Sequence, residues 1–265
     1  MYLKERYGKQ ALIAGASEGI GAEFSLYLAK AGINLVLIAR GKEKLESFAS
    51  SLEENYHIKV QPVSCDLSDN DSVNYLTTVL GNGRTDILVY NAALSYIGPF
   101  EADTDEHMNR IMQANMITPL NLVKRIGGEM AAKGRGAIIL MSSLAGLQGS
   151  GFLSSYASTK AFNRILAESL WYEWKDRGVD VIACCAGATS TENYIKTNPG
   201  KPGFLAPRVT TPREVVKECF RYLGKRPSFI AGTGNRIAGM FMQRILPRRL
   251  AVKIMGDNTR KIYRI

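Results

Sequence analysis

The sequence predicts an α/β fold in which a doubly wound parallel sheet of about seven strands carries helices on both faces. Short apolar runs rich in Val, Ile and Leu alternate with segments of helical period, which is the pattern of βαβ units. The runs are almost continuously apolar, as in strands that are buried on both faces. A glycine-rich turn, AGASEGIG, joins the first run to the first helical segment. Together these features predict a Rossmann-like architecture.

The strands and helices can be assigned in order along the chain. The strand-like runs are QALIAG (10–15), NLVLIAR (34–40), IKVQPVSCD (58–66), DILVYNA (86–92), GAIILMSS (136–143), VDVIACCAG (179–187) and SFIAG (228–232). The helical segments are expected at 21–32, 42–56, 69–81, 105–126, 155–178 and 211–225. Right-handed crossovers between parallel strands then build one sheet. Without an internal repeat or linker, we expect one domain over 1–234 and an appended basic tail over 235–265.

The composition is that of a globular protein, with 46% hydrophobic and 22% charged residues. No apolar run approaches the roughly eighteen residues that span a bilayer, and the opening MYLKERYGK lacks the apolar core of a secretory signal. The four cysteines and two histidines have no metal-ligand spacing. These features predict a cytoplasmic protein with reduced thiols and no metal site.

The net charge of +10 is concentrated at the C-terminus. From Arg236 onward the chain has eight Lys/Arg and one Asp. A nucleic-acid-binding domain needs a basic stripe on its folded face, and here the body is nearly neutral. We therefore expect no nucleic-acid partner.

The glycine turn has the features of a phosphate-binding site. Gly15, Gly19 and Gly21 lie between the first strand and the first helix. Glycines let the backbone turn tightly and approach a pyrophosphate, and the N–H groups at a helix start favour its negative charge. Because the spacing G-x-x-x-G-x-G differs from the common G-x-G-x-x-G fingerprint, a glycine-rich turn without a ligand is the alternative.

Residues after the second and third strands indicate which dinucleotide would bind. An acid that binds the adenosine ribose is usual near the end of the second strand, but this chain has Ala39 and Arg40 there. A cation at this point favours a 2′-phosphate, and so NADP over NAD; a solvated loop charge is the alternative for Arg40. Asp66 follows the third strand, where it can meet the adenine edge or cap a helix.

A possible acid–base centre lies in the stretch SSYASTK. Tyr156 and Lys160 are spaced i, i+4 and share a helix face, and Ser143 ends the preceding strand. Ligands bind at the carboxyl ends of parallel strands, so the three side chains can converge on one crevice. A cation about 4 Å from the phenolate would lower the pKa of Tyr156 by roughly three units from about 10. A general acid–base for an alcohol or alkoxide needs such a pKa.

GASEGIG, YNAA, Asn115, Ser143 and YASTK resemble the short-chain dehydrogenase/reductase family in order and spacing, over residues 8–232. The resemblance implies a hydride-transferring oxidoreductase with Tyr156 as acid–base and Ser143 as carbonyl anchor. Lys160 would bind the nicotinamide ribose, and Asn115 would hold a water of a proton relay. The cofactor-binding residues that we predict are Gly15, Ser17, Gly19, Ile20, Gly21, Arg40, Asp66, Leu67, Asn91, Ala92, Tyr156, Lys160, Gly187 and Thr189.

The backbone of Asn115 is a second candidate for the relay. Pro119 lies four residues later and has no N–H, so the Asn115 carbonyl loses its helical partner. We expect a kink here and a carbonyl that can accept the relay water. A plain proline kink is the alternative.

The segment TSTENYIKTNPGKPGFLAPRVTTP (189–212) lies where this family has a mobile lid over the substrate. Its Tyr194, Ile195, Phe204 and Leu205 indicate an apolar ligand, and a connecting loop is the alternative. KERYGKQALIAGASEGIG and TPREVVKECFRYLGKRPSFIAG resemble bacterial NADP-dependent 7β-hydroxysteroid dehydrogenases. This resemblance implies a steroid ketone or alcohol, with acyl and aryl ketones as alternatives. The basic tail is a departure from that subgroup.

In the tail, apolar Ile237, Met240, Phe241 and Ile245 recur at helical spacing among cations. The pattern suits a helix docked over the substrate mouth or at a subunit contact, and also a helix on an anionic membrane surface. Docking is favoured, because a tail on a folded domain must cover something.

The family resemblance implies a homodimer or homotetramer through the long helices. A different class of function is a non-catalytic NADP-binding regulatory protein on the same fold. Such a protein has no need of Ser143, Tyr156 and Lys160 together, so the enzyme is favoured.

Overall fold

The computed structural model describes residues 2–81, 83–197, 199–200 and 208–265. Its centre is one sheet of order β3-β2-β1-β4-β5-β6-β7, in which every neighbouring pair is parallel. The strands are β1 (Gln10–Ala14), β2 (Asn34–Ala39), β3 (Val60–Ser64), β4 (Ile87–Tyr90), β5 (Gly136–Ser143), β6 (Val179–Ala186) and β7 (Ser228–Ile230). The predicted doubly wound sheet is confirmed. Its strand order reverses at β1, between β2 and β4, which is where such sheets bind ligands.

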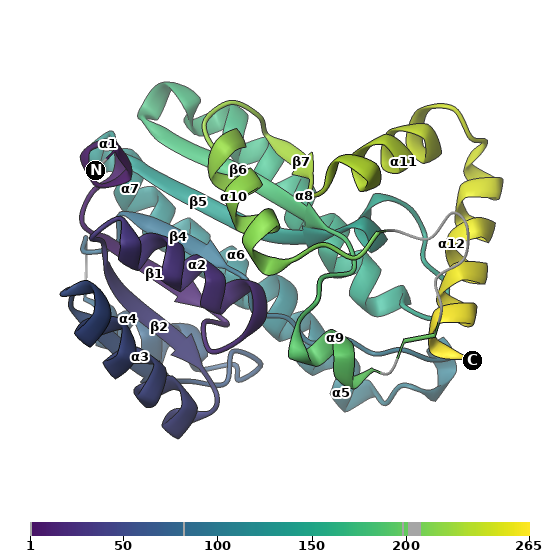
Figure 1. Cartoon of the computed structure of the whole chain (residues 1–265), viewed down its shortest axis with the longest axis horizontal. Coiled ribbons are helices and arrows are strands. Elements are labelled where there is room, and N and C mark those ends of the chain that lie inside the picture. The colour runs from purple at the N-terminus through teal and green to yellow at the C-terminus, as the bar shows by residue number, and fades with distance from the viewer. Residues whose placement is uncertain (1, 82, 198, 201–207) are drawn as a thin grey trace.

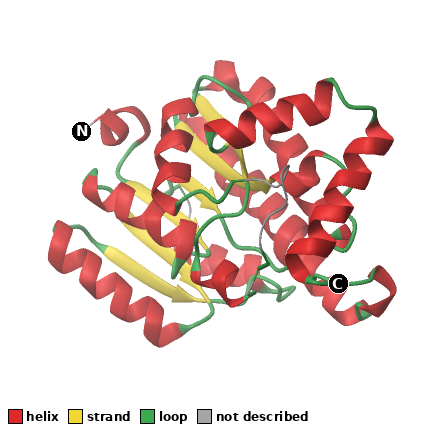
Figure 2. Cartoon of the chain, turned by 45° about the vertical axis from the view of Figure 1, so that its right-hand side comes forward, coloured by secondary structure: helices red, strands yellow, loops and turns green. Residues whose placement is uncertain are grey.

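Helices cover both faces of the sheet (Figure 2). They are α1 (Tyr2–Tyr7), α2 (Gly19–Lys30), α3 (Lys42–Tyr56), α4 (Ser72–Leu80), α5 (Asp105–Met112), α6 (Thr118–Leu122), α7 (Gly128–Lys133), α8 (Ser154–Trp174), α9 (Glu192–Lys196), α10 (Pro212–Tyr222), α11 (Thr233–Arg244) and α12 (Arg248–Tyr263). None of the helices in the described part of the chain has the length and apolar content needed to cross a membrane.

The two faces of the sheet bury separate apolar clusters. Ile13 of β1 packs in the cluster covered by α2, α3 and α10, which contains Phe24 and Val216. Leu12, its neighbour on β1, packs in the opposite cluster with Leu76 of α4 and Trp174 of α8. Because successive strand residues point to opposite faces, a strand between two layers of helices must be apolar throughout.

The helical segment predicted at 105–126 is one long helical rod with two wide turns. α5, α6 and α7 are joined by π-helical turns at η2 (Gln113–Ile117) and η3 (Val123–Gly127). The first of these contains Asn115 and directly precedes Thr118-Pro119. A π-turn is one way in which a helix accommodates a missing hydrogen bond, and it lies where we expected a kink.

The basic tail packs against the body at the end of the molecule far from the N-terminus (Figure 1). Asn235 is buried and exchanges two hydrogen bonds with the backbone of Arg208, at 2.7 and 3.0 Å. Arg236 forms an ion pair with Glu218 of α10 at 2.9 Å. In α12, the Arg260 guanidinium lies 5.2 Å from the ring centre of Phe152. The tail therefore docks on the segments around the carboxyl edge of the sheet.

The docked face of α11 is not the apolar stripe found in the sequence. Gly239 faces the body so closely that a Cβ there would lie 2.6 Å from Ile230. Ile237, Met240, Phe241 and Ile245 point outward and are 45% to 67% exposed. A small residue lets a helix pack closely, so the face with Gly239 lies against the body. The large apolar residues that the sequence pattern picked out lie on the opposite face.

Candidate functional site

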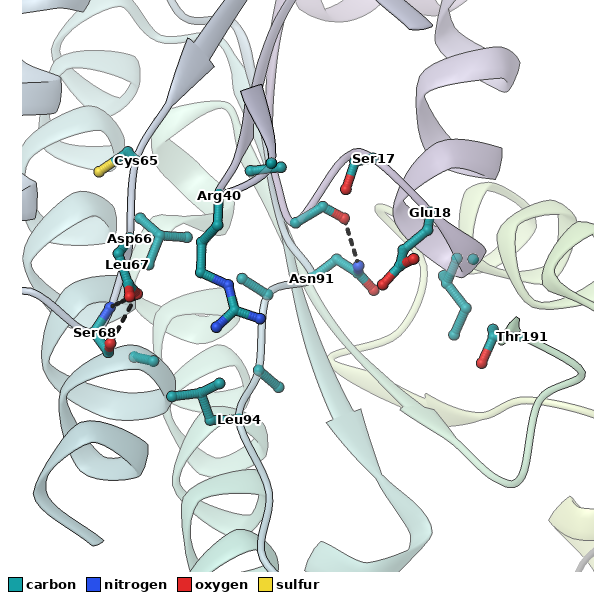
Figure 3. Close-up of a pocket in the computed structure, with 18 of the residues that line it drawn as sticks. Ser17, Glu18, Arg40, Cys65, Asp66, Leu67, Ser68, Asn91, Leu94 and Thr191 are labelled. Atoms are coloured by element: carbon teal, nitrogen blue, oxygen red, sulfur yellow. Dashed lines mark hydrogen bonds between the residues drawn. The ribbon is translucent and has the colours of Figure 1, made fainter. Parts of the chain in front are cut away.

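An open crevice of about 780 Å³ lies at the carboxyl ends of β1, β2, β3 and β4. Figure 3 shows the residues that line it, with Arg40 reaching between Asp66 and Asn91. The predicted residues on its walls are Gly15, Ser17, Gly19, Ile20, Arg40, Asp66, Leu67, Asn91, Ala92 and Tyr156. The volume is that of a pocket for a small organic ligand or cofactor.

The glycine turn brings backbone against backbone at the start of α2. Gly15 has φ +76°, and a Cβ on it would lie 2.7 Å from the Ala92 nitrogen. A Cβ on Gly21 would lie 1.8 Å from the Gly15 oxygen, which accepts a hydrogen bond from Asn91 Nδ2 at 2.9 Å. No side chain fits at these two positions, so α2 begins directly beside the crevice and directs its first N–H groups toward it.

Arg40 and Asp66 lie on the same side of the crevice. The Asp66 carboxylate accepts hydrogen bonds from the Ser68 N–H and hydroxyl, at 2.9 and 2.7 Å, and from Arg110 at 3.1 Å. Burial raises the pKa of Asp66, but the Ser68 bonds and the charges of Arg110 and Arg40 outweigh it and lower the pKa overall. Asp71 and not Asp66 occupies the N-cap position of α4, without a side-chain cap hydrogen bond, so Asp66 is not the helix cap considered as the alternative.

Lys44 connects the glycine turn to the segment after β6. Its ammonium lies 3.1 Å from Glu18 and 3.5 Å from Glu192 of α9. The three side chains lie at the open rim of the crevice. Exposed ion pairs contribute little to stability, but these connect segments that are distant in the sequence.

Three of the four predicted catalytic side chains lie close together at the point where Tyr156 lines the crevice. Tyr156 lies on the first turn of α8, lines the crevice and is hydrogen-bonded by the Ser143 side chain at the end of β5. Lys160, one turn later, is 3% exposed, and its Nζ donates a 2.9 Å hydrogen bond to the Met141 carbonyl. That Nζ lies 5.6 Å from the Tyr156 ring centre.

The expected low pKa of Tyr156 is wrong for this chain by itself, because its pKa is raised above the usual value. Burial raises the pKa of Tyr156, and the Ser143 hydrogen bond lowers it by less. Burial also lowers the pKa of Lys160 to about 8. Burial is the largest cause of both shifts, because it disfavours the charged form of the phenol and of the ammonium.

Asn115 is completely buried and forms hydrogen bonds at every polar atom of its side chain. Its Oδ1 accepts from the Leu94 N–H at 2.8 Å, and its Nδ2 donates to the Leu94 carbonyl at 2.8 Å and to Thr159 Oγ1 at 3.0 Å. The Asn115 carbonyl, expected to receive a relay water, accepts a 3.0 Å hydrogen bond from Asn163 Nδ2. A side chain of α8 therefore uses one of the two lone pairs of that carbonyl, and the relay water stays a prediction.

Four predicted cofactor residues do not lie on the crevice wall: Gly21, Lys160, Gly187 and Thr189. Thr189 is buried and hydrogen-bonds Gly187, while Thr191 lines the crevice and caps α9. The signal for Thr191 was its place before Glu192, where Thr commonly begins a helix. Of the lid residues, Ile195 is exposed and Tyr194 half-buried. Phe204 and Leu205 lie outside the described residues.

Comparisons with known proteins agree with this geometry. The family model described as short chain dehydrogenase matches residues 9–202. A 7β-hydroxysteroid dehydrogenase of Clostridium sardiniense is 31% identical over 236 residues, which are 89% of this chain and 90% of the relative.

Solved structures show the same relationship. A 7β-hydroxysteroid dehydrogenase studied for its stereoselectivity matches with a TM-score of 0.89 and 29% identity, covering 96% of this chain and 98% of its own. A short-chain dehydrogenase of Sphingobium yanoikuyae in complex with NADPH matches with a TM-score of 0.75 and 28% identity, over 84% of this chain and 87% of its own. The 7β-hydroxysteroid dehydrogenase structure covers 96% of this chain, so the uncovered part is shorter than the tail, and most of the tail must be matched. The expectation that the tail is a departure from this subgroup was therefore wrong.

We expect Lys160→Met to raise the Tm at pH 7, with a smaller gain at pH 10. The pKa of Lys160 is about 8 in the folded chain, against about 10.4 for an unfolded lysine. Below pH 8 the buried Lys160 is charged in the folded protein, and its lost solvation lowers the free energy of unfolding. This destabilisation is lost as the pH rises toward about 10.4, because the folded lysine is neutral first. Thermal unfolding at the two pH values checks this; the exposed Lys30, changed to Met, is the control, and equal gains at both pH values would contradict it.

Proposed function

Because the chain belongs to the short-chain dehydrogenase family, we propose that it is an NADP-dependent oxidoreductase that interconverts an apolar ketone and its secondary alcohol. The observation that carries this proposal is the meeting of Tyr156, Ser143 and Lys160 at the inner end of the nucleotide crevice. The family acts on CH–OH groups and uses a nicotinamide cofactor, so these side chains have the roles that the chemistry requires.

The crevice fits a nicotinamide dinucleotide. Its glycine turn leaves no room for a Cβ at Gly15 or Gly21, and the N–H groups that begin α2 suit a pyrophosphate. Arg40 stands where an acid would bind an unphosphorylated ribose. NADPH, when bound, supplies the hydride that reduces the carbonyl carbon.

The side chains of the chain itself handle the oxygen and the proton. The Ser143 hydroxyl donates a hydrogen bond to the substrate carbonyl oxygen and orients it. The phenol of Tyr156 donates its proton to that oxygen as negative charge develops, and takes the proton back in the alcohol-to-ketone direction. Lys160, positioned by the Met141 carbonyl, stabilises the phenolate that results. Burial keeps Tyr156 protonated in the free chain, which is the form that reduction needs.

The substrate class that we propose is a steroid or a similarly bulky apolar ketone. In support, 7β-hydroxysteroid dehydrogenases are similar to this chain over about nine-tenths or more of both lengths, both in sequence and in structure. Tyr194 and Ile195 add apolar surface to the segment after β6. Acyl and aryl ketones are the alternatives, and a non-catalytic NADP-binding regulator is the alternative function.

We also propose that the protein is a cytoplasmic homo-oligomer with the domain boundaries predicted above. All four cysteines are free, in keeping with a reducing compartment. Ile117 and Leu120 on the α5–α7 rod and Ile165 and Tyr172 on α8 are exposed. Exposed apolar side chains on long helices are suited to subunit contacts.

Turnover of a ketone panel tests the reaction. We expect NADPH oxidation with at least one of a 7-keto bile acid, a β-ketoacyl thioester and an aryl diketone. Tyr156→Phe should reduce kcat by about 10²-fold or more, because it removes the proton donor. The rate of NADPH oxidation by both proteins, followed by absorbance, measures this difference in kcat. Tight NADPH binding without turnover across the panel would favour the regulatory alternative.

Arg40→Ala should weaken NADPH much more than NADH. Loss of a charge-assisted hydrogen bond to a phosphate costs about 1.5–3 kcal/mol, or roughly 10–100-fold in affinity. NADH lacks that phosphate, so its KM should hardly change. Lys42→Ala is the matched control, because this lysine is 71% exposed and pairs only weakly, at 3.9 Å, with Glu46. Equal loss of both cofactors in Arg40→Ala would contradict the assignment.

We further propose that the outward face of α11 contacts an anionic lipid surface. Its four exposed apolar side chains lie beside Arg244, Arg248 and Arg249, which are also exposed. We expect the protein to float with phosphatidylserine vesicles at low salt, and Phe241→Glu to reduce flotation about tenfold. Neutral phosphatidylcholine vesicles are the control. Flotation that is absent, or equal for both lipids, would refute the contact.

A further inference from the structure

Asn163 is a buried polar residue of α8 to which the proposed reaction gives no role. It lies one turn beyond Lys160 and is 2% exposed. Its Nδ2 donates a 3.0 Å hydrogen bond to the Asn115 carbonyl, on the facing helical rod. Its Oδ1 is buried and has no hydrogen-bond partner among the residues that the structure describes. The unpaired acceptor costs stability, whereas the Nδ2 group of the same side chain has a partner.

The partner of Asn163 is an unusual carbonyl. Asn115 lies in the π-helical turn η2, and the residue four positions later, Pro119, has no N–H to donate. A buried carbonyl needs a donor. Asn163 supplies one from a different helix, so this hydrogen bond joins α8 to the rod at the point where the rod is irregular.

From Asn115 the contacts run to both halves of the site. Its side chain holds the N–H and carbonyl of Leu94, which lines the nucleotide crevice after β4. It also donates to Thr159 Oγ1, and that hydroxyl donates to the Tyr156 carbonyl at 2.8 Å. The crevice wall at Leu94 and the first turn of α8 with Tyr156 are therefore both hydrogen-bonded to the Asn115 side chain, the second through Thr159. Asn163 in turn holds the backbone of Asn115.

We propose that Asn163 is a positioning residue that, through its Nδ2 hydrogen bond to the Asn115 carbonyl, sets the place of Tyr156 relative to the crevice wall at Leu94. The proposal rests on the reaction proposed above. Asn163 acts here as a hydrogen-bond donor and not only as a side chain that fills space, because the Asn115 carbonyl can only accept. A displacement of about 1 Å between reacting groups can cost roughly 10² in rate.

Asn163→Asp separates donation from shape. The introduced carboxyl has almost the same size, and it can donate an O–H to the Asn115 carbonyl only while protonated. Burial raises the pKa of such a carboxyl above its usual value of about 3.9. We expect kcat relative to the unchanged protein to be close to one at low pH and to fall about tenfold or more as the pH rises through that pKa. KM for NADPH should change less than about twofold.

Asn163→Ala and Ser72→Ala complete the set. Asn163→Ala should have a kcat that is lower by about tenfold at every pH. Ser72 is also buried, and its hydroxyl lies 3.4 Å from Thr118 on the same rod, away from Asn115. Its loss should lower the Tm without changing kcat. If Asn163→Asp follows the pH profile of the unchanged protein, or if Asn163→Ala keeps full kcat, the proposal is overturned.

A readout without turnover keeps the test independent of the proposed function. The Leu94 N–H bonds to Asn115 Oδ1, so its hydrogen exchange reports whether Asn115 is held in place. We expect faster exchange at Leu94 in Asn163→Ala and unchanged exchange in Ser72→Ala. Exchange at the rate of the unchanged protein would overturn the positioning role, whether or not a ketone is reduced. Absence of turnover in the unchanged protein, with faster exchange in Asn163→Ala, would refute the proposed reaction and leave the positioning role supported.

Discussion

The crevice depends on a backbone contact at which no side chain can be placed. The turn after β1 lies against the segment after β4, and a Cβ on Gly15 would lie 2.7 Å from the Ala92 nitrogen. At Gly21, the Gly15 oxygen occupies the space that a Cβ would need. Because both positions are glycine, α2 can start at the edge of the sheet. Every other part of the site is arranged around this contact. Arg40 and Asp66 reach the crevice from the next two strands, and Tyr156 reaches it from beyond β5.

The interior next to the crevice is more polar than the core of the sheet requires. Lys160 is buried as a cation with a backbone carbonyl as partner, and burial lowers its pKa to about 8. Asn115 and Asn163 bury two amides on facing helices, and the Asn163 oxygen has no partner in the described part of the chain. The buried cation of Lys160 and the unpaired oxygen of Asn163 each lower stability relative to an apolar residue. They cluster around Tyr156, as expected when function and not stability selects the residue types.

The carboxyl edge of the sheet is covered by segments from the far end of the chain. Gly200 donates a hydrogen bond to the Ile262 carbonyl, and Arg260 lies over Phe152. Tyr263 is close enough to raise the pKa of Tyr156 by its charge, after the larger effect of burial. The end of α12 therefore lies near Tyr156. A 7β-hydroxysteroid dehydrogenase structure matches this chain over 96% of its length, which is too much to leave out the whole of α12.

The sequence alone determined the sheet, the glycine turn and the i, i+4 spacing of Tyr156 and Lys160, because periodicity and glycine geometry are local properties of the chain. Only the tertiary structure decided the balance of solvation and charge at Tyr156, since burial depends on residues from distant strands. It also decided that Asn163 donates a hydrogen bond to the Asn115 carbonyl, because the local sequence of neither helix indicates a hydrogen bond between them. For α11, the sequence located a helix but not its inner face: close packing selected Gly239 and left the large apolar residues outside.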